Sequence, residues 1–392
     1  MPGFEFFGEQ EKKEVLEVLD SGVLMRYGFD GMRNGHWKAK ELEEALSKRM
    51  GVSYTQLVSS GTAALTVALA SAKIGKGDEV IMPTFTFVAS FEAILAIGAI
   101  PVLADVDATL TLSPEAVKKA ITPKTKAIMS VHMCGSMADL KALKDIATTN
   151  NLILLEDACQ AIGGSYEGKP LGSYGDLGCF SFDFVKTITS GEGGAVITNN
   201  EQYYINADNY SDHGHDHIGK DRGAEQHTLL GYNFRISELH AAVGIAQLRK
   251  LDDFIAMQKQ RYTILREALA TISAITFRTI PQSGVENYSF LSFFLPSEGI
   301  TKKVNTALKE AGIDVCFYWF DNNWHYYIKW NHLKELQETG GLPSYSFSDF
   351  TLSDSYISRN ISCLIKLGWT EEEMRYRAQK MVKVIEDVLT SL

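Results

Sequence analysis

Lys186 is the first residue in the sequence whose surroundings point to chemistry. Apolar residues dominate positions 180–185, and a run of Thr, Ser and Gly follows as far as residue 194. Burial among apolar groups disfavours the charged form of a lysine, and the neutral amine is a nucleophile toward an aldehyde. A lysine on an exposed loop is the alternative. The glycines fit neither a Walker A loop nor a GxGxxG turn, because a strand-like run at 195–198 follows them.

A second group of polar residues follows the apolar run at 152–155, namely Glu156, Asp157 and Gln160. In an open α/β sheet, ligands bind beyond the carboxyl ends of the strands, so Asp157 stands where a ligand is expected. The same aspartate could instead cap a helix, bind Mg²⁺ or pair with an arginine.

A third candidate is the small-residue turn at 59–62, which runs straight into a helix-like segment. The free N–H groups of a helix N-terminus bind anions, and Gly61 adds no bulky side chain there, so the turn suits a phosphate. Taken alone, a Ser or Thr before a helix is more often a simple N-cap.

The three candidates together match the needs of one cofactor. They supply a phosphate cradle, a carboxylate that keeps a pyridinium nitrogen protonated, and an amine that forms a Schiff base with an aldehyde. Pyridoxal 5′-phosphate (PLP) requires these three groups. The sequence therefore predicts a PLP enzyme.

Further segments extend this pattern along the chain: 60–65, 77–81, 83–88, 156–161, 180–182 with Lys186, 191–194 and 231–235. In these segments the sequence resembles a known family, the fold-type I PLP enzymes of the DegT/DnrJ/EryC1/StrS sugar aminotransferase group. The resemblance covers nearly the whole chain and is most specific between residues 58 and 251. It implies an α/β fold, in which a large domain with a mostly parallel mixed sheet precedes a smaller C-terminal α+β domain.

The resemblance also implies roles for individual residues around the cofactor ring. Lys186 would form the Schiff base with PLP and later move a proton between the substrate carbon and the cofactor carbon. Asp157 would pair with the pyridinium nitrogen, and Gln160 would hydrogen-bond the ring hydroxyl. Phe87 matches the aromatic residue that stacks on the ring.

At the phosphate, the resemblance implies contacts from Gly61, Thr62 and Ser181 of one chain. Asn233 would join them from the neighbouring subunit. A homodimer with shared active sites is therefore implied.

The identity of residue 186 bears on the reaction. In a related branch of the family a histidine stands there and the enzyme dehydrates a keto sugar, whereas Lys186 favours transamination. The resemblance implies a ping-pong reaction in which L-glutamate gives its amino group to a keto or aldehydo sugar. The alternatives are a PLP-dependent sugar dehydratase or lyase, and a PLP-binding protein without turnover.

Five residues are candidate contacts to the acceptor sugar: Arg26, Arg33, His213, Trp319 and His325. Two arginines can bind a carboxylate or a diphosphate bidentately, and aromatic rings stack on sugar faces. Core or dimer packing is an equally good interpretation of the aromatic run that contains Trp319.

Two acceptors are expected. One is a form of the lipopolysaccharide sugar acid Kdo, whose amination gives 8-amino-3,8-dideoxy-manno-octulosonate. The other is a nucleotide-linked 4-keto-6-deoxy sugar.

A metal site is not expected, although His213, His215 and His217 alternate. Three imidazoles at this spacing could in principle hold a metal ion. The family has an Asn-His-Gly stretch near this position, so the resemblance instead implies a loop at the mouth of the active site.

Alternating elements must position these residues. Strand-like runs at 79–82, 101–106, 126–131 and 152–155 alternate with helix-like stretches at 62–72, 88–97, 113–120 and 137–149. Such alternation predicts a mostly parallel sheet covered on both faces. A single long helix is predicted over 237–270. We expect a large PLP-binding domain at 1–251, with a helical segment at about 1–50, and a small domain at 252–392.

Composition narrows the class of protein. The 392 residues are 45% apolar and 22% charged, which is typical of a globular protein. The net charge of −10 argues against partners such as nucleic acid or an anionic membrane. The five cysteines are scattered and form no CxxC pair, which suits a reducing compartment, and we expect a cytoplasmic enzyme.

Overall fold

A seven-stranded sheet lies at the centre of the structure, a computed structural model that describes residues 3–219, 223–338 and 350–391. The strands are β1 (Tyr54–Val58), β2 (Glu79–Pro83), β3 (Ile100–Ala104), β4 (Thr125–Val131), β5 (Ile153–Asp157), β8 (Leu177–Ser181) and β9 (Gly194–Thr198). Their order across the sheet is β1-β9-β8-β5-β4-β2-β3. The strand β9 runs in the direction opposite to the other six strands of this sheet. The mostly parallel mixed sheet confirms the predicted α/β fold.

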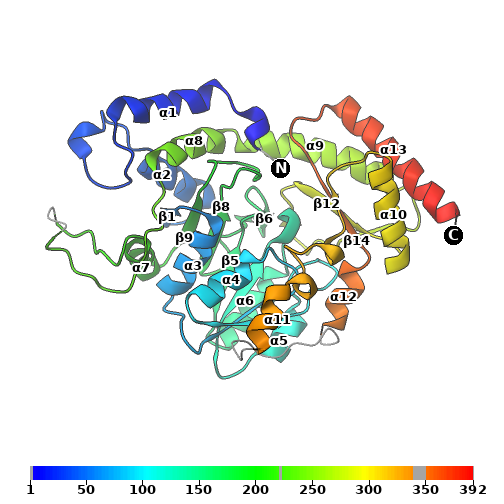
Figure 1. Cartoon of the computed structure of the whole chain (residues 1–392), viewed down its shortest axis with the longest axis horizontal. Coiled ribbons are helices and arrows are strands. Elements are labelled where there is room, and N and C mark those ends of the chain that lie inside the picture. The colour runs from blue at the N-terminus through cyan, green and yellow to red at the C-terminus, as the bar shows by residue number, and fades with distance from the viewer. Residues whose placement is uncertain (1–2, 220–222, 339–349, 392) are drawn as a thin grey trace.

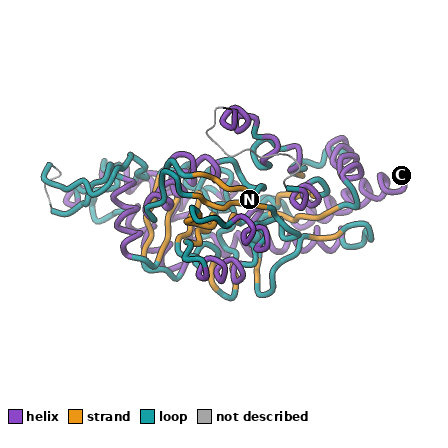
Figure 2. Tube along the Cα trace, turned by 90° about the horizontal axis from the view of Figure 1, so that it is seen from below, coloured by secondary structure: helices purple, strands orange, loops and turns teal. Residues whose placement is uncertain are grey.

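Helices cover both faces of this sheet (Figure 2). They are α3 (Gly61–Ser71), α4 (Ala89–Ala96), α5 (Pro114–Ala120), α6 (Leu140–Thr149) and α7 (Glu201–Ser211). Neighbouring residues of β2 point to opposite faces: Val80 is buried with Phe91 of α4, and Ile81 is buried with Leu143 of α6. A strand buried on both faces is apolar at nearly every position, which explains why the sequence shows these strands as continuous apolar runs.

The two N-terminal helices pack against a helix from the middle of the chain, α8 (Glu238–Arg249) (Figure 1). Both α1 (Glu9–Ser21) and α2 (Lys38–Met50) contact α8. The single long helix predicted over 237–270 is wrong: α9 (Leu251–Leu269) follows α8 after Lys250. The two helices have different partners, because α9 packs against the C-terminal helix α13 (Glu371–Thr390). The Lys250 ammonium ties their junction to the N-terminal region by binding Glu11 at 2.6 Å.

The C-terminal half of the chain has its own antiparallel sheet and core. The strands, in the order β10-β12-β14-β13, are β10 (Thr276–Phe277), β12 (Phe290–Phe294), β14 (Asn360–Leu364) and β13 (Cys316–Phe317). Around them lie α10 (Glu298–Glu310), α11 (Asn331–Glu338), α12 (Thr351–Ile357) and α13. A three-stranded sheet of β6 (Ser165–Tyr166), β7 (Lys169–Pro170) and β11 (Gly284–Val285) joins the two halves. The domain boundary at residue 251 stays a prediction.

One C-terminal segment packs against the large sheet rather than within its own half. Trp319 and Tyr326 are buried in the same core as Phe85, which follows β2. The backbone N–H of Thr86 donates to the carbonyl of His325 at 3.0 Å, and a bridge pairs Phe85 with Tyr326. The aromatic segment around residues 319–327 therefore faces the carboxyl ends of the large-domain strands.

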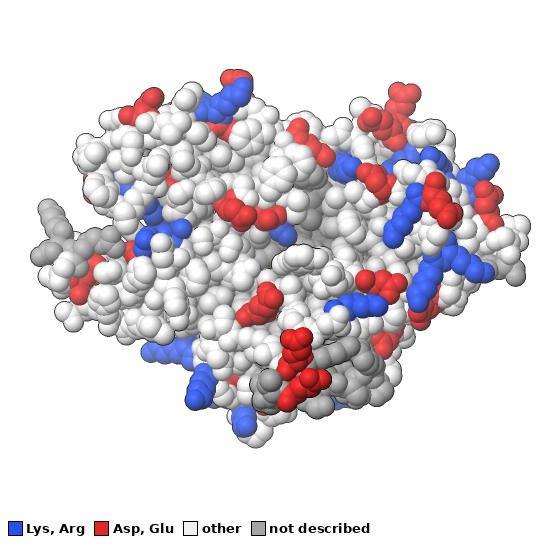
Figure 3. Space-filling view, in the orientation of Figure 1, with Lys and Arg blue, Asp and Glu red and all other residues white. Residues whose placement is uncertain are grey.

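Acidic and basic side chains are mixed over the face of the molecule seen in Figure 3 rather than gathered by sign. No helix among the residues that the structure describes is long and apolar enough to cross a membrane. The His, Cys, Asp and Glu side chains in the described part of the chain form no group of three that could hold a metal ion.

Candidate active site

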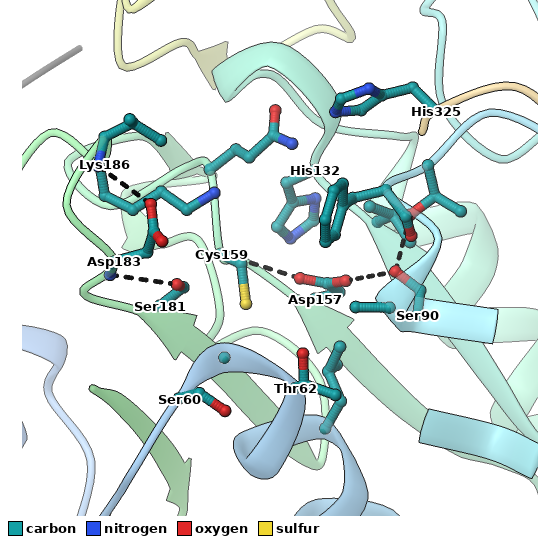
Figure 4. A pocket seen from close by; sticks show the side chains of 18 of the residues that line it. Ser60, Thr62, Ser90, His132, Asp157, Cys159, Ser181, Asp183, Lys186 and His325 are labelled. Carbon is teal, nitrogen blue, oxygen red and sulfur yellow. Dashed lines mark hydrogen bonds between the residues drawn. The ribbon is translucent and has the colours of Figure 1, made fainter. Parts of the chain in front are cut away.

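A cavity of about 700 Å³ opens at the carboxyl ends of the parallel strands (Figure 4). We call floor ten of the lining residues from the first half of the chain: Ser60, Gly61, Thr62, Phe87, His132, Asp157, Gln160, Ser181, Asp183 and Lys186. We call wall the lining residues from the second half: Phe290, Phe317, Trp319, Asn322, His325 and Leu364. The position agrees with the rule that ligands of open α/β sheets bind where the parallel strands end.

The N-terminus of α3 forms one end of the floor. Ser60 caps the helix, since its Oγ accepts a hydrogen bond from the backbone nitrogen of Ala63 at 3.0 Å. The N–H groups of Gly61 and Thr62 lie in the first turn, where backbone donors have no partner within the helix. A Cβ on Gly61 would lie 2.7 Å from the Cβ of Ser181 and 3.0 Å from its Oγ. Glycine thus lets the Ser181 side chain lie close to the first turn of α3, which brings its hydroxyl near two backbone donors.

Asp157 is the last residue of β5, and its carboxylate is fixed from two sides. Oδ2 accepts a hydrogen bond from Ser90 Oγ at 2.8 Å, and Oδ1 accepts one from the backbone N–H of Cys159 at 3.2 Å. Ser90 is in turn bonded to the hydroxyl of Thr86 at 2.7 Å. The side chain is only 6% exposed and lines the cavity. A charged acceptor therefore stands in a fixed orientation at the centre of the floor.

Lys186 lies in the turn after β8, and its side chain extends toward the cavity (Figure 4). Its backbone nitrogen donates to the carbonyl of Asp183 at 3.0 Å, and its own carbonyl accepts from the backbone nitrogen of Gly3 at 3.0 Å. Phe4 lines the cavity and stacks on Phe184 with ring centroids 4.3 Å apart. The N-terminal segment thus holds the lysine loop. The sequence did not show this contact, because no local pattern links residues 3–4 to 184–186.

Gln160 and His132 complete the floor. Oε1 of Gln160 accepts a hydrogen bond from the backbone N–H of Cys134 at 3.0 Å, so the NH₂ end of the amide is available to a ligand. His132 is fully buried, and its Nε2 bonds Glu156 at 2.8 Å. Sequence analysis missed His132. It directly follows β4, so the strand-end rule that pointed to Asp157 could have found it as well.

Aromatic and polar side chains form the wall. Phe317 and Trp319 stack at 4.8 Å, and the ring of His325 lies 4.6 Å from that of Trp319. Nδ1 of His325 bonds Oδ1 of Asn322 at 2.9 Å. Because an amide oxygen only accepts, Nδ1 carries the proton and Nε2 remains an acceptor. Burial, together with the charge of Lys186, lowers the pKa of His325 to about 3. The wall therefore offers a neutral imidazole.

Phe87 joins the floor to the wall. Its ring lies 5.4 Å from that of His325 and stacks on Trp324 at 5.6 Å, with 9° between the planes. The cavity thus contains three of the aromatic or imidazole residues expected at the site: Phe87, Trp319 and His325.

The structure differs from expectation for Arg26 and Arg33, which do not line the cavity. Arg26 is 5% exposed and pairs with Glu43 and with Oε1 of Gln56, the latter at 3.0 Å. Arg33 is 2% exposed and donates to the carbonyl of Met25 at 2.7 Å and to a second carbonyl at 2.8 Å. Their guanidinium groups bind protein groups around the N-terminal segment, so in this structure they do not face a ligand.

His213 and Asn233 also lie outside the cavity of one chain. Both side chains are exposed, and a backbone bridge pairs Asp212 with Asn233. Exposed apolar neighbours, Leu230 and Tyr232, precede Asn233. A contact between Asn233 and the site would need a second copy of the chain, so this role stays a prediction.

The comparison with protein families decides the family. The model of the DegT/DnrJ/EryC1/StrS aminotransferase family matches residues 6–380. The chain belongs to this family. It is an aminotransferase, as predicted, and the family is PLP-dependent.

Two curated proteins and one solved structure resemble the chain over most of its length. GDP-perosamine synthase of Escherichia coli O157:H7 is 37% identical over 264 residues, 67% of this chain and 69% of that protein. L-glutamine:2-deoxy-scyllo-inosose aminotransferase of Streptoalloteichus tenebrarius is 39% identical over 308 residues, 76% and 72% of the two chains. The crystal structure of 3-amino-5-hydroxybenzoic acid synthase matches with a TM-score of 0.84 at 30% identity and covers 97% of each chain. These likenesses confirm the predicted fold class.

Proposed function

We propose that this family member is a PLP-dependent sugar aminotransferase that moves an amino group from L-glutamate to a keto or aldehydo sugar in two half-reactions. The supporting observation is that Lys186, Asp157 and the N-terminus of α3 face one cavity. When bound, PLP supplies an aldehyde that takes up amino groups and a ring that withdraws electrons from the substrate.

In this proposal the floor holds the cofactor. The N–H groups of Gly61 and Thr62 and the hydroxyl of Ser181 bind the phosphate. The close approach of Ser181 to Gly61, which a Cβ at Gly61 would prevent, supports this assignment. Asp157 holds a proton on the ring nitrogen, because a carboxylate fixed by two hydrogen bonds stabilises the charged pyridinium. The NH₂ group of Gln160 donates to the ring oxygen.

Lys186 is the proposed catalytic residue. Its Nζ would hold the cofactor between turnovers and would carry a proton between the substrate carbon and the cofactor carbon. The backbone of the lysine is held by Asp183 on one side and by Gly3 on the other. Such anchoring lets the amine return to the same position in each half-reaction.

The wall is the proposed binding surface for the acceptor. Phe317 and Trp319 offer flat apolar rings to a sugar face and exclude water from the floor. Nε2 of His325 accepts a hydrogen bond from a sugar hydroxyl, and the amide nitrogen of Asn322 donates one. A neutral wall of this kind recognises hydroxyl groups rather than charge.

Two acceptors are candidates. The overall resemblance of the sequence favours an aldehydo form of Kdo, which would give 8-amino-3,8-dideoxy-manno-octulosonate. The likeness to GDP-perosamine synthase favours a nucleotide-linked 4-keto-6-deoxy sugar instead. The burial of Arg26 and Arg33 removes the residue-level argument for a sugar acid. L-glutamine is the alternative donor, because the inosose aminotransferase is named for it.

The visible absorption spectrum of the purified protein with PLP tests the cofactor and the donor together. We expect a band of the bound cofactor that L-glutamate bleaches in the absence of any sugar. Lys186→Ala should lose this conversion, whereas Lys119→Ala, at an exposed lysine of α5, should keep it. A band that neither L-glutamate nor L-glutamine changes would contradict transamination from these donors. Absence of a band would contradict the cofactor assignment.

The acceptor is tested by supplying each candidate sugar to the aminated enzyme and weighing the product by mass spectrometry. Gain of an amino group identifies the acceptor. Loss of water from the sugar without gain of nitrogen would instead indicate the dehydratase alternative.

We also propose a homodimer in which Asn233 reaches the phosphate of the partner's cofactor. Its place on an exposed surface beside Leu230 and Tyr232 supports this. Light scattering should show a dimer, and Asn233→Ala should weaken PLP binding. A monomeric protein with full activity would contradict the shared site.

A further inference from the structure

Two cysteines face each other across neighbouring strands of the C-terminal sheet. Cys316 of β13 pairs with Cys363 of β14, and their Sγ atoms are 3.0 Å apart. The adjacent pair, Val315 and Leu364, makes the backbone hydrogen bond, at 3.0 Å. Cys316 and Cys363 therefore occupy a non-hydrogen-bonded pair, where the Cα atoms of antiparallel strands come within about 4.5 Å. That spacing lies within the range that a disulfide can bridge.

The two thiols differ in charge and access. Cys363 is 1% exposed, whereas Cys316 is only partly buried, so a small reagent meets Cys316 first. A hydrogen bond from Cys363 and the nearby guanidinium of Arg377, 3.8 Å from Sγ, lower the pKa of Cys316. The same hydrogen bond, together with burial, raises the pKa of Cys363. The Cys316 thiol is thus suited to attack an oxidant. Cys363 is in position to resolve because its Sγ lies 3.0 Å from that of Cys316.

We propose that Cys316 and Cys363 form an oxidation-sensitive thiol pair that hydrogen peroxide converts to a disulfide. The Cys316 thiolate attacks one peroxide oxygen, the O–O bond breaks, hydroxide leaves, and a sulfenic acid remains. The sulfur of Cys363 then attacks the Cys316 sulfur and loses its proton, and the sulfenic hydroxyl leaves as water. In sum, two thiols are oxidised by two electrons and one peroxide is reduced to two waters.

The position of the pair links it to the cavity. β13 is one of the two edge strands of its sheet, and its second residue, Phe317, lines the cavity and stacks on Trp319. Leu364, the residue after Cys363, lines the cavity as well. A disulfide would therefore link the two strands that carry the wall residues Phe317 and Leu364. The pair takes no part in holding PLP, so this inference stands apart from the proposed function.

The test uses the full-length protein, exposed to hydrogen peroxide in small molar excess. Remaining thiols are then blocked with iodoacetamide, and the digest is analysed by mass spectrometry. We expect a linked peptide pair containing Cys316 and Cys363 that is lighter by two hydrogens and disappears after reduction. Cys134→Ser is the matched control, because Cys134 is also buried and its pKa is raised to about 12 by burial. This control should form the same cross-link.

The cross-link should also raise Tm by a few °C, because it restrains the chain between two residues 47 positions apart. Cys316→Ser should abolish both the cross-link and the rise in Tm. Cys363→Ala serves as a second variant if serine at 316 disturbs folding, and it should leave Cys316 to oxidise alone. Three results would overturn the proposal: over-oxidised Cys316 without a cross-link in the wild type, a disulfide between chains, or a rise in Tm that persists in both variants.

Discussion

The floor and the wall of the cavity are positioned by different kinds of contact. In the floor, Asp157 and Ser181 end strands of the large sheet, and Gly61 begins a helix, so the local element fixes each side chain. Two wall residues, Trp319 and His325, are supported differently, since they are held by backbone bonds and packing against residues 84–88, far away in the sequence. In the proposed function, the floor therefore sets the chemistry and the wall selects the acceptor.

The largest effect is expected for Asp157→Asn in the floor. The amide keeps the shape of the side chain but loses the charge that would hold a proton on the ring nitrogen. We expect the L-glutamate half-reaction to slow by roughly 10²–10³-fold, the usual range for removal of one electrostatic contact at a reacting centre. Stopped-flow absorbance would measure it, with Asp145→Asn, at an exposed aspartate, as the control. A variant as fast as the wild type would remove Asp157 from the mechanism.

The next effect is expected at the phosphate end of the floor. Gly61→Ala would place a Cβ 2.7 Å from that of Ser181. Overpacking of about 1–3 kcal/mol should weaken PLP binding by roughly 5–150-fold. Fluorescence titration with PLP would give the affinity. Gly299→Ala is the matched control, because a Cβ there meets nothing within 4 Å. Equal affinities for both variants would contradict a phosphate at this helix N-terminus.

A smaller and more selective effect is expected in the wall. His325→Asn removes the Nε2 acceptor, and loss of one hydrogen bond of about 1.4 kcal/mol should slow the acceptor half-reaction roughly tenfold. The rate of the donor half-reaction should decrease less than the rate of the acceptor half-reaction. Single-turnover measurements of the two would show the split. An equal loss in both would mean that the wall does not discriminate the acceptor from the donor.

The pH dependence of the acceptor step sharpens this test. Because burial and the Lys186 charge hold the pKa of His325 near 3, the ring stays neutral throughout the range from about pH 5 to 8. The pH profile of the acceptor half-reaction rate should therefore be the same near pH 6.5 in the wild type and in His325→Asn. A titration near pH 6.5 that is present in the wild type and absent in the variant would contradict a neutral His325.

Residues of the floor were easier to predict from the sequence than residues that depend on contacts between distant segments. The strand-end rule pointed to Asp157, and the small-residue turn pointed to Gly61. Both are local signals, and the elements that carry them lie within a few residues of the predicted bounds. His132 obeys the same rule and was overlooked. The family resemblance added Phe87, Gln160 and Ser181, which the structure places in the same cavity.

The remaining features depend on contacts between distant segments, which local patterns do not encode. The sequence suggests Arg26 as a ligand contact. In the structure, however, its guanidinium forms an ion pair with Glu43 and donates a hydrogen bond to Gln56. Cys316 and Cys363 read as unrelated residues until the sheet pairs their strands. The break at Lys250 falls within an uninterrupted helical pattern, and only the different partners of α8 and α9 distinguish its two sides.

The smallest expected effect of a substitution is on stability, at His217, in a segment that belongs to neither floor nor wall. His217 lies in the chain between α7 and Asn233, and its ring bonds Asp208 at 2.8 Å and Asp212 at 3.0 Å. Burial alone lowers the pKa of His217, but these two carboxylates more than compensate and raise it to about 9. An unfolded histidine titrates near 6.5, so the stabilisation is complete below about pH 6.5 and is lost as the pH rises through 9.

We therefore expect His217→Gln to lower the free energy of unfolding by roughly 1 kcal/mol at about pH 6, less than full linkage would give because solvent screens part of the ring. At about pH 10 the difference should nearly vanish. Urea unfolding of both proteins at the two pH values would measure it, with His36→Gln, at an exposed histidine, as the control. An equal loss of unfolding free energy at both pH values would show that packing, and not charge, stabilises the segment. The packing partner would be Tyr27, whose ring lies 4.3 Å from that of His217. In that case the segment that carries Asn233 would be fixed in the way the wall is, by aromatic contact between distant residues.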